Sequence, residues 1–125
     1  MPKHVSEQAV IANLRTATAV PMDETTFEAP FGRWRGNEGQ DHYLRNLAQF
    51  DEQRTAEFEP LLGSIRTPVR IIWGEEDAWL DPAFARRLHD LLPYSDLVLI
   101  PEAGHFAMED SPELVAQALD EFFGA

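Results

Sequence analysis

The sequence contains no cysteine among its 125 residues, and this absence excludes several kinds of chemistry. Disulfide scaffolds, cysteine-ligated zinc sites and thiol catalysis all need that residue. Long apolar runs are missing too, and none approaches the roughly 20 residues of a membrane-spanning helix. The first seven residues lack the apolar stretch of a secretory signal peptide, so we expect a cytoplasmic protein.

Basic residues are scarce in this sequence. Lys and Arg number 10 against 22 Asp and Glu, which gives a formal net charge of −12. A surface that binds nucleic acid needs clustered Lys and Arg to contact phosphates, so we expect no nucleic-acid partner. An anionic membrane surface is disfavoured for the same reason. With 44% hydrophobic and 26% charged residues, the composition is that of a folded domain and not of a disordered chain.

Two short apolar runs in the second half of the chain have the composition of buried strands. They are Val69–Trp73, followed by Gly74, and Leu97–Ile100, followed by Pro101. Neither run alternates apolar and polar side chains, and β-branched residues are frequent in both. This pattern favours strands that are buried on both faces of a parallel sheet.

Two segments in this half carry the start signals of helices. Asp81 precedes Pro82 before the first segment, and Ser111 precedes Pro112 before the second. We therefore expect Asp81 and Ser111 as N-caps, with each proline at the first helical position. Pro93 is expected to end the first helix. The order strand, helix, strand, helix predicts the α/β class, with a parallel crossover followed by a covering helix.

The first part of the chain has no such strand-like run. Apolar side chains at helical spacing predict one helix within residues 5–14 and another within 41–58. Between them, residues 18–39 contain two prolines and three glycines, so we predict a long loop with short helical turns at most. We divide the chain into a helical segment, 1–67, and an α/β segment, 68–125.

Two strands are too few for an independently stable sheet, which generally needs three strands or broad packing against helices. Both predicted strands have the composition of doubly buried strands, yet few other elements are available to cover them. We therefore expect the chain to be the C-terminal piece of a larger α/β protein.

Titratable side chains follow both predicted strands. Asp77 comes three residues after Gly74, and His105 lies in the loop after the second strand. Sites in parallel α/β sheets form beyond the carboxyl ends of the strands, so we expect the two side chains to lie close together. A carboxylate bound to an imidazole fixes its tautomer and stabilises the imidazolium that forms when the ring takes a proton. Asp77 and His105 are thus the predicted catalytic residues.

Other interpretations of these residues stay open. Asp81 is a second candidate for the carboxylate, although its place before Pro82 favours helix capping. His105 and Glu109 are four residues apart, but no second histidine lies at ligand spacing, so we expect no metal site.

Four aromatic residues are candidates for contact with a substrate. Phe27, Phe31 and Trp34 are concentrated in the irregular stretch, and Phe106 directly follows His105. Ordinary packing explains the first three as well as a pocket does.

A wider set of motifs surrounds the two candidate catalytic residues. It comprises Val69–Trp73, Gly74-Glu75-Glu76-Asp77, Pro82, Ala103-Gly104-His105-Phe106, Asp110, Pro112 and Phe122-Phe123. In this combination and spacing, residues 68–123 resemble the C-terminal end of the α/β-hydrolase superfamily. The resemblance implies that Asp77 is the triad acid and His105 the general base, in the family's chain order. It implies a small-molecule substrate and no cofactor. Residues 36–59 resemble, more weakly, the end of a family cap or lid.

The family nucleophile has no counterpart in this sequence. It lies in Gly-x-Ser-x-Gly, or with Asp in place of Ser, and no serine here has glycines two residues to either side. The segment that forms the oxyanion hole is missing too. Without an attacking group the covalent mechanism cannot be completed.

The resemblance therefore implies a protein that, when complete, hydrolyses a small apolar ester, epoxide, halide or related substrate, while the isolated chain is inactive. Two alternatives stay open. One is a non-catalytic interaction module on a hydrolase scaffold, and the other is one half of a split hydrolase. In both, an exposed sheet edge would bind a partner chain or a second copy.

Overall fold

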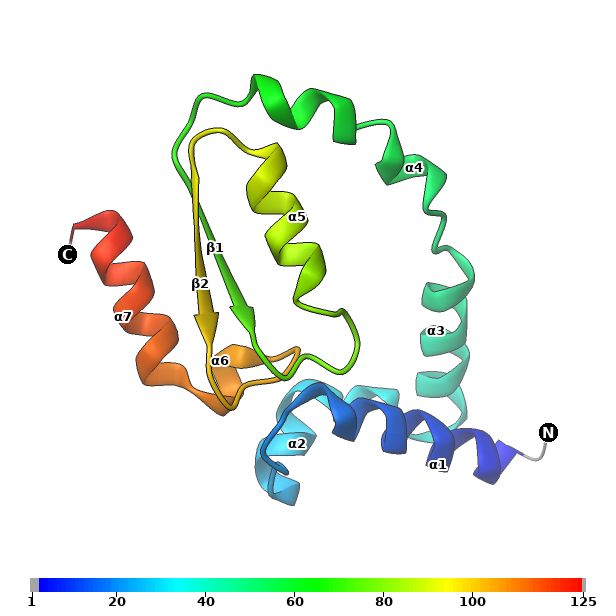
Figure 1. Cartoon of the computed structure of the whole chain (residues 1–125). Helices are drawn as coiled ribbons and strands as arrows, with labels where there is room; N and C mark the ends of the chain where they lie inside the picture. The colour runs from blue at the N-terminus through cyan, green and yellow to red at the C-terminus, as the bar shows by residue number, and fades with distance from the viewer. Residues whose placement is uncertain (1–2, 125) are drawn as a thin grey trace.

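A computed structural model describes residues 3–124 of the chain (Figure 1). The N-terminal half is helical, with α1 (Lys3–Leu14), η1 (Arg15–Ala17), α2 (Glu24–Phe31), η2 (Gly32–Trp34), α3 (Gly36–Ala48), α4 (Gln53–Ala56) and η3 (Glu59–Ser64). The C-terminal half contains β1 (Val69–Gly74), α5 (Ala83–Leu91), β2 (Ser95–Ile100), α6 (Ala107–Asp110) and α7 (Pro112–Phe123). Figure 1 shows α5 and α7 on opposite sides of the two strands, while α1 and α2 lie beyond their carboxyl ends.

The two strands are parallel neighbours, as predicted. Their register runs from Val69 opposite Ser95 to Gly74 opposite Ile100, so both strands end at the same edge. On the α5 side, Ile71 packs in a cluster with Ala85 and Leu92. On the other side, a cluster around Ile100 includes half-buried side chains of β1, β2 and α7. Most strand residues are only half-buried, because α5 and α7 cover only part of each face.

The predicted helix starts are present with small differences. Asp81 lies one residue before the N-cap of α5, where its Oδ1 accepts the N–H of Ala83 at 2.8 Å. Pro82 stands at the cap position and not at the first helical position. Ser111 is the N-cap of α7 with Pro112 next, but its side chain makes no capping hydrogen bond.

The long loop predicted over residues 18–39 is wrong for most of its length. Helix α2 and the start of α3 occupy this stretch. The Asp23 carboxylate caps α2, where it accepts the N–H of Thr26 at 2.9 Å. Pro30 lies near the end of α2, where the loss of its N–H disturbs little of the helix.

The helix predicted over residues 41–58 is also divided in two. It begins earlier, at Gly36, and stops at Ala48 before the short α4. The helix predicted over residues 5–14 is confirmed within α1. In the described residues that precede β1 there is no strand, as predicted.

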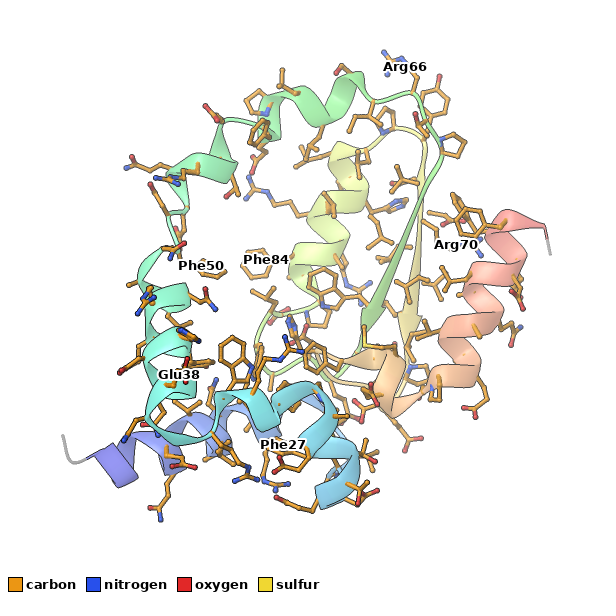
Figure 2. The ribbon with its side chains drawn as sticks, turned by 180° about the vertical axis from the view of Figure 1, so that it is seen from behind. Phe27, Glu38, Phe50, Arg66, Arg70 and Phe84 are labelled. Atoms are coloured by element: carbon orange, nitrogen blue, oxygen red, sulfur yellow. The ribbon has the colours of Figure 1, made fainter. Side chains whose placement is uncertain are left out.

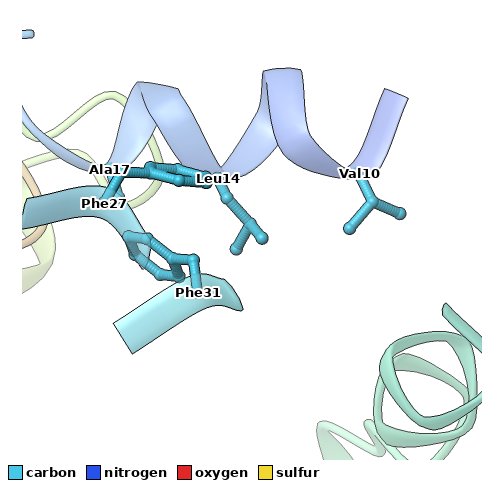
Figure 3. Close-up of a cluster of buried hydrophobic side chains, with 5 residues drawn as sticks. All are labelled: Val10, Leu14, Ala17, Phe27 and Phe31. Carbon is cyan, nitrogen blue, oxygen red and sulfur yellow. The ribbon is translucent and has the colours of Figure 1, made fainter. Parts of the chain in front are cut away.

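The N-terminal helices share a small hydrophobic core. Its buried members are Val10, Leu14, Ala17, Phe27 and Phe31. Figure 3 shows Leu14, Ala17 and the two phenylalanines converging where α1 faces α2. Phe27 is 0% exposed, and its ring lies 4.9 Å from that of Phe31. The spacing of four residues places both rings on one face of α2.

The Arg70 side chain links β1 and β2 to α7. Its guanidinium forms an ion pair with Asp96, which is directly opposite in the strand register, and donates to the carbonyl of Ala118 at 2.7 Å. It also lies 5.5 Å from the ring centre of Phe122. Figure 2 shows this side chain reaching from β1 toward α7.

Truncation of Phe27 should destabilise the N-terminal core strongly. Phe27→Ala removes a fully buried ring, and we expect a loss of about 3–5 kcal/mol in the free energy of unfolding, measured by denaturant titration. Phe50→Ala is the matched control, because Phe50 is 86% exposed. That control should change stability by about 0.5 kcal/mol or less. Equal losses in the two variants would contradict this packing.

Candidate active site

The loops that follow β1 and β2 are held against each other by backbone hydrogen bonds. The N–H of Glu75 donates to the carbonyl of Ile100, and that of Glu76 to the carbonyl of Ala103, both at 2.9 Å. Gly74 permits this approach, because a Cβ there would lie 2.2 Å from the carbonyl oxygen of Gly104. Any larger residue at position 74 would push the loops apart.

Asp77 and His105 meet where these loops adjoin. His105 Nδ1 lies 2.9 Å from Asp77 Oδ2. The Asp77 side chain is only 3% exposed, whereas that of His105 is 28% exposed. The structure thus brings together the two side chains that the sequence singled out.

The other Asp77 oxygen is bound by the residue's own loop. Oδ1 accepts the N–H of Trp79 at 2.8 Å and that of Leu80 at 2.9 Å. Burial raises the pKa of Asp77, but the hydrogen bonds from Leu80, His105 and Trp79 outweigh it, and the net pKa lies below the ordinary 3.8. The carboxylate is therefore ionised at neutral pH and oriented from two sides.

Asp81, the alternative carboxylate, is placed elsewhere. It accepts the N–H of Ala83 at the start of α5 and has no contact with the imidazole among its hydrogen bonds. With Nδ1 directed at Asp77, the ring nitrogen left to exchange a proton with a reactant is Nε2 of His105.

Trp79 is a site residue that the sequence reasoning missed. Its ring centre lies 4.8 Å from that of His105, and its Nε1 donates to Thr16 Oγ1 at 2.8 Å. The indole therefore covers one side of the imidazole while it is held by the helical segment. Its only sequence signal was its position two residues after Asp77.

An apolar cavity of about 230 Å³ adjoins the pair. It is lined by Ile72, Trp73, Gly74, Asp77, His105, Ala107, Met108 and Val115.

The four aromatic residues predicted to contact a substrate do not line this cavity. Phe27 and Phe31 are buried in the N-terminal core, and Trp34 packs edge-on against Tyr43 with ring centres 5.7 Å apart. Phe106 lies between that core and the site, 5.5 Å from the ring of Phe31 and 5.6 Å from that of His105.

Within residues 3–124, no group of three or more His, Asp or Glu side chains is arranged to hold a metal ion. In the same residues, no helix has both the length and the hydropathy to cross a bilayer.

The structure has a parallel β–α–β unit, and beyond its strand ends an ionised carboxylate is hydrogen-bonded to a histidine. This arrangement is found in α/β hydrolases. A model of the alpha/beta hydrolase family matches residues 5–118, and the chain belongs to this family.

Similar proteins of known sequence and structure agree with this assignment. The chain is 29% identical over 120 residues to the uncharacterized hydrolase YugF of Bacillus subtilis, a match that covers 94% of this chain. It is 28% identical to an α/β hydrolase fold protein from Burkholderia ambifaria, with a TM-score of 0.88 over 97% of this chain. A thermophilic esterase matches with 26% identity and a TM-score of 0.74 over 98% of this chain.

The chain spans less than half the length of these proteins. The matched region is 43% of YugF, 45% of the Burkholderia ambifaria protein and 47% of the esterase.

Acid titration should reveal the ionisation of Asp77. Because its folded pKa lies below its unfolded value, it stabilises the fold above about pH 3.9, and this contribution is lost as the pH falls through the folded value. We expect the free energy of unfolding, measured between pH 6 and pH 2, to fall less steeply in Asp77→Asn than in wild type. The difference in slope is at most about 1.4 kcal/mol per pH unit.

Asp96 supplies a control for this experiment. Its pKa is also lowered, chiefly by its hydrogen bond to Arg70, so Asp96→Asn should flatten the curve separately. The double variant should add the two changes, because the residues share no partner. An unchanged slope in Asp77→Asn would contradict the ionised, hydrogen-bonded state.

Proposed function

We propose that this chain supplies the acid and the general base of a hydrolase, which when complete cleaves a small, fairly apolar ester, epoxide, halide or related substrate. The observation that carries the proposal is the 2.9 Å contact between His105 Nδ1 and the buried carboxylate of Asp77. The adjoining cavity has mainly apolar lining residues, which supports a substrate with an apolar body.

The geometry supports a defined role for each side chain. With a serine nucleophile, His105 Nε2 takes the hydroxyl proton as the oxygen attacks, and then gives that proton to the leaving group. In the second half-reaction the same nitrogen takes a proton from water, which attacks the covalent intermediate. Each time, the imidazolium that forms lies beside the negative charge of Asp77. With an aspartate nucleophile, His105 acts only in the water step.

The attacking group must come from outside these 125 residues, because they contain no nucleophile elbow. The matched proteins are about twice as long as the region they share with this chain, which leaves room for such a segment. One of them is described as an esterase, which favours ester cleavage among the candidate reactions. The DNA that precedes the codon for Met1 tests this point. An in-frame Gly-x-Ser-x-Gly, or its aspartate form, would support the proposal, and unrelated sequence behind a stop codon would oppose it.

Substitutions in a longer protein that contains this chain and the elbow test the roles directly. We expect His105→Ala to abolish turnover of a nitrophenyl ester, and Asp77→Asn to lower kcat by about 10³–10⁴-fold because it favours the wrong imidazole tautomer. His42→Ala is the histidine control, since His42 is exposed on α3, and it should leave turnover unchanged.

The isolated 125-residue chain tests whether the nucleophile is missing. It should show no ester hydrolysis above the rate of free imidazole. Hydrolysis by the purified 125-residue chain that disappears in His105→Ala would contradict the missing nucleophile.

A second candidate function is an interaction module, or one half of a split hydrolase. It is favoured by large apolar side chains that are exposed, including Phe50 (86%), Phe58 (55%) and Phe84 (59%). Figure 2 shows Phe50 and Phe84 projecting from the ribbon where the α3–α4 region faces α5. Light scattering tests the interaction module, which a stable monomer with no exposed apolar surface would oppose. Copurification tests the split hydrolase, which an isolated chain that finds no partner would oppose. A cytoplasmic location, without nucleic-acid or membrane partners, stays a prediction in either case.

A further inference from the structure

Asp110 joins two parts of the chain that are far apart in sequence. Its Oδ2 accepts the N–H of Ala19 at 2.8 Å and the N–H of Gly104 at 2.7 Å, and its Oδ1 accepts the N–H of Val20 at 2.9 Å. One carboxylate thus binds three backbone donors. Two of them belong to the segment that links η1 to α2, and the third belongs to the loop that carries His105.

The last residue of η1, directly before this segment, binds the residue on the other side of His105. The N–H of Phe106 donates to the carbonyl of Ala17 at 2.8 Å. The backbone amides immediately before and after His105 are therefore both bound, one by Asp110 and the other by Ala17, which lies two residues before Ala19. Neither bond involves the imidazole itself.

The packing at this junction leaves no free space. A Cβ on Gly104 would lie 2.9 Å from the nitrogen of Ala19 and 3.0 Å from the carbonyl oxygen of Ala17. The other loop of the site is attached to the same segment through the bond from Trp79 Nε1 to Thr16 Oγ1. Residues 16–20, which we name the bridging segment, therefore contact both loops that form the site.

We propose that Asp110 is a positioning residue for His105. It ties the bridging segment to Gly104 and so sets the backbone from which the imidazole reaches Asp77. Without this carboxylate, three N–H groups lose their acceptor, and the Gly104 amide is no longer held. The loop can then rotate, and the distance of 2.9 Å between His105 and Asp77 is no longer enforced. The effect on turnover rests on the proposed function, whereas the effect on the imidazole does not.

Nuclear magnetic resonance of the ¹⁵N-histidine-labelled chain tests this placement. The wild-type imidazole of His105, assigned by loss of its signals in His105→Gln, should be the Nδ1–H tautomer with a slowly exchanging proton. Asp110→Asn keeps the side-chain shape but replaces one acceptor oxygen by an NH₂ donor. We expect a mixture of tautomers, and amide hydrogen exchange at Gly104 and Phe106 that is about tenfold faster.

Glu109→Gln is the matched control, because it removes the same charge from the neighbouring exposed position. It should leave the tautomer and both exchange rates at their wild-type values. Circular dichroism checks that each variant is folded. A folded Asp110→Asn with an unchanged His105 tautomer would overturn the proposal.

Val20→Pro provides a second variant in case Asp110→Asn does not fold. It removes the N–H that Oδ1 accepts, fixes φ at position 20 and restricts the backbone of Ala19, while the Asp110 side chain and the Gly104 amide stay chemically unchanged. A smaller change in the same direction at His105 supports the proposal. Loss of folding in both variants would assign Asp110 to the stability of the helical segment and would also overturn it.

Kinetics in the longer protein separate this proposal from the proposed function. If His105 is the base, Asp110→Asn should lower kcat by about tenfold with little change in KM. If His105→Ala retains turnover while Asp110→Asn still shifts the imidazole tautomer, the proposed function fails and the positioning role stands. If His105→Ala abolishes turnover and Asp110→Asn leaves both kcat and the tautomer unchanged, the positioning role of Asp110 fails and the proposed function stands.

Discussion

The parallel pairing of β1 with β2 is the constraint on which the rest of the structure depends. Its register places Gly74 opposite Ile100, so the two following loops leave the sheet side by side. The bond from the N–H of Glu75 to the carbonyl of Ile100 continues this pairing beyond the strands. Because Gly74 has no side chain, the loops approach closely enough for Asp77 to reach His105, which lies 28 residues away in the sequence. An antiparallel pair would send the two loops to opposite ends of the sheet.

The loop that contains Asp77 holds an ionised carboxylate in a fixed orientation. Its backbone donors bind one carboxylate oxygen and leave the other for His105. Such preorganised groups stabilise a developing charge without the reorganisation that water requires. The cost of burying Asp77 is offset by these hydrogen bonds, as its lowered pKa indicates. Trp79 supplies one of the donors and also packs against the imidazole, so a single loop both orients and covers the pair.

Helix α2 shows why local composition misled the prediction for residues 18–39. Prolines and glycines disfavour helix at each position, and their number predicted a loop. The residues that oppose this tendency are Asp23, which caps the helix, and the pair Phe27 and Phe31, which are buried on one face. Burial of two aromatic rings contributes more free energy than the propensities of a few residues remove. This burial depends on α1, and a window of neighbouring residues carries no information about it.

Local patterns in the sequence predicted both strands and the two longer helices of the α/β half, but not the short helix α6. Continuous apolar runs, the carboxylate of Asp81 before Pro82, and the distances of Asp77 and His105 from the strand ends are all readable within a few residues. The attachment of this half to the helical segment was decided only by the tertiary structure. Asp110 binds N–H groups about 90 residues away, at Ala19 and Val20. Nearly every residue carries such a donor, so the sequence does not mark which of them a carboxylate will bind, and only the folded chain brings the partners together.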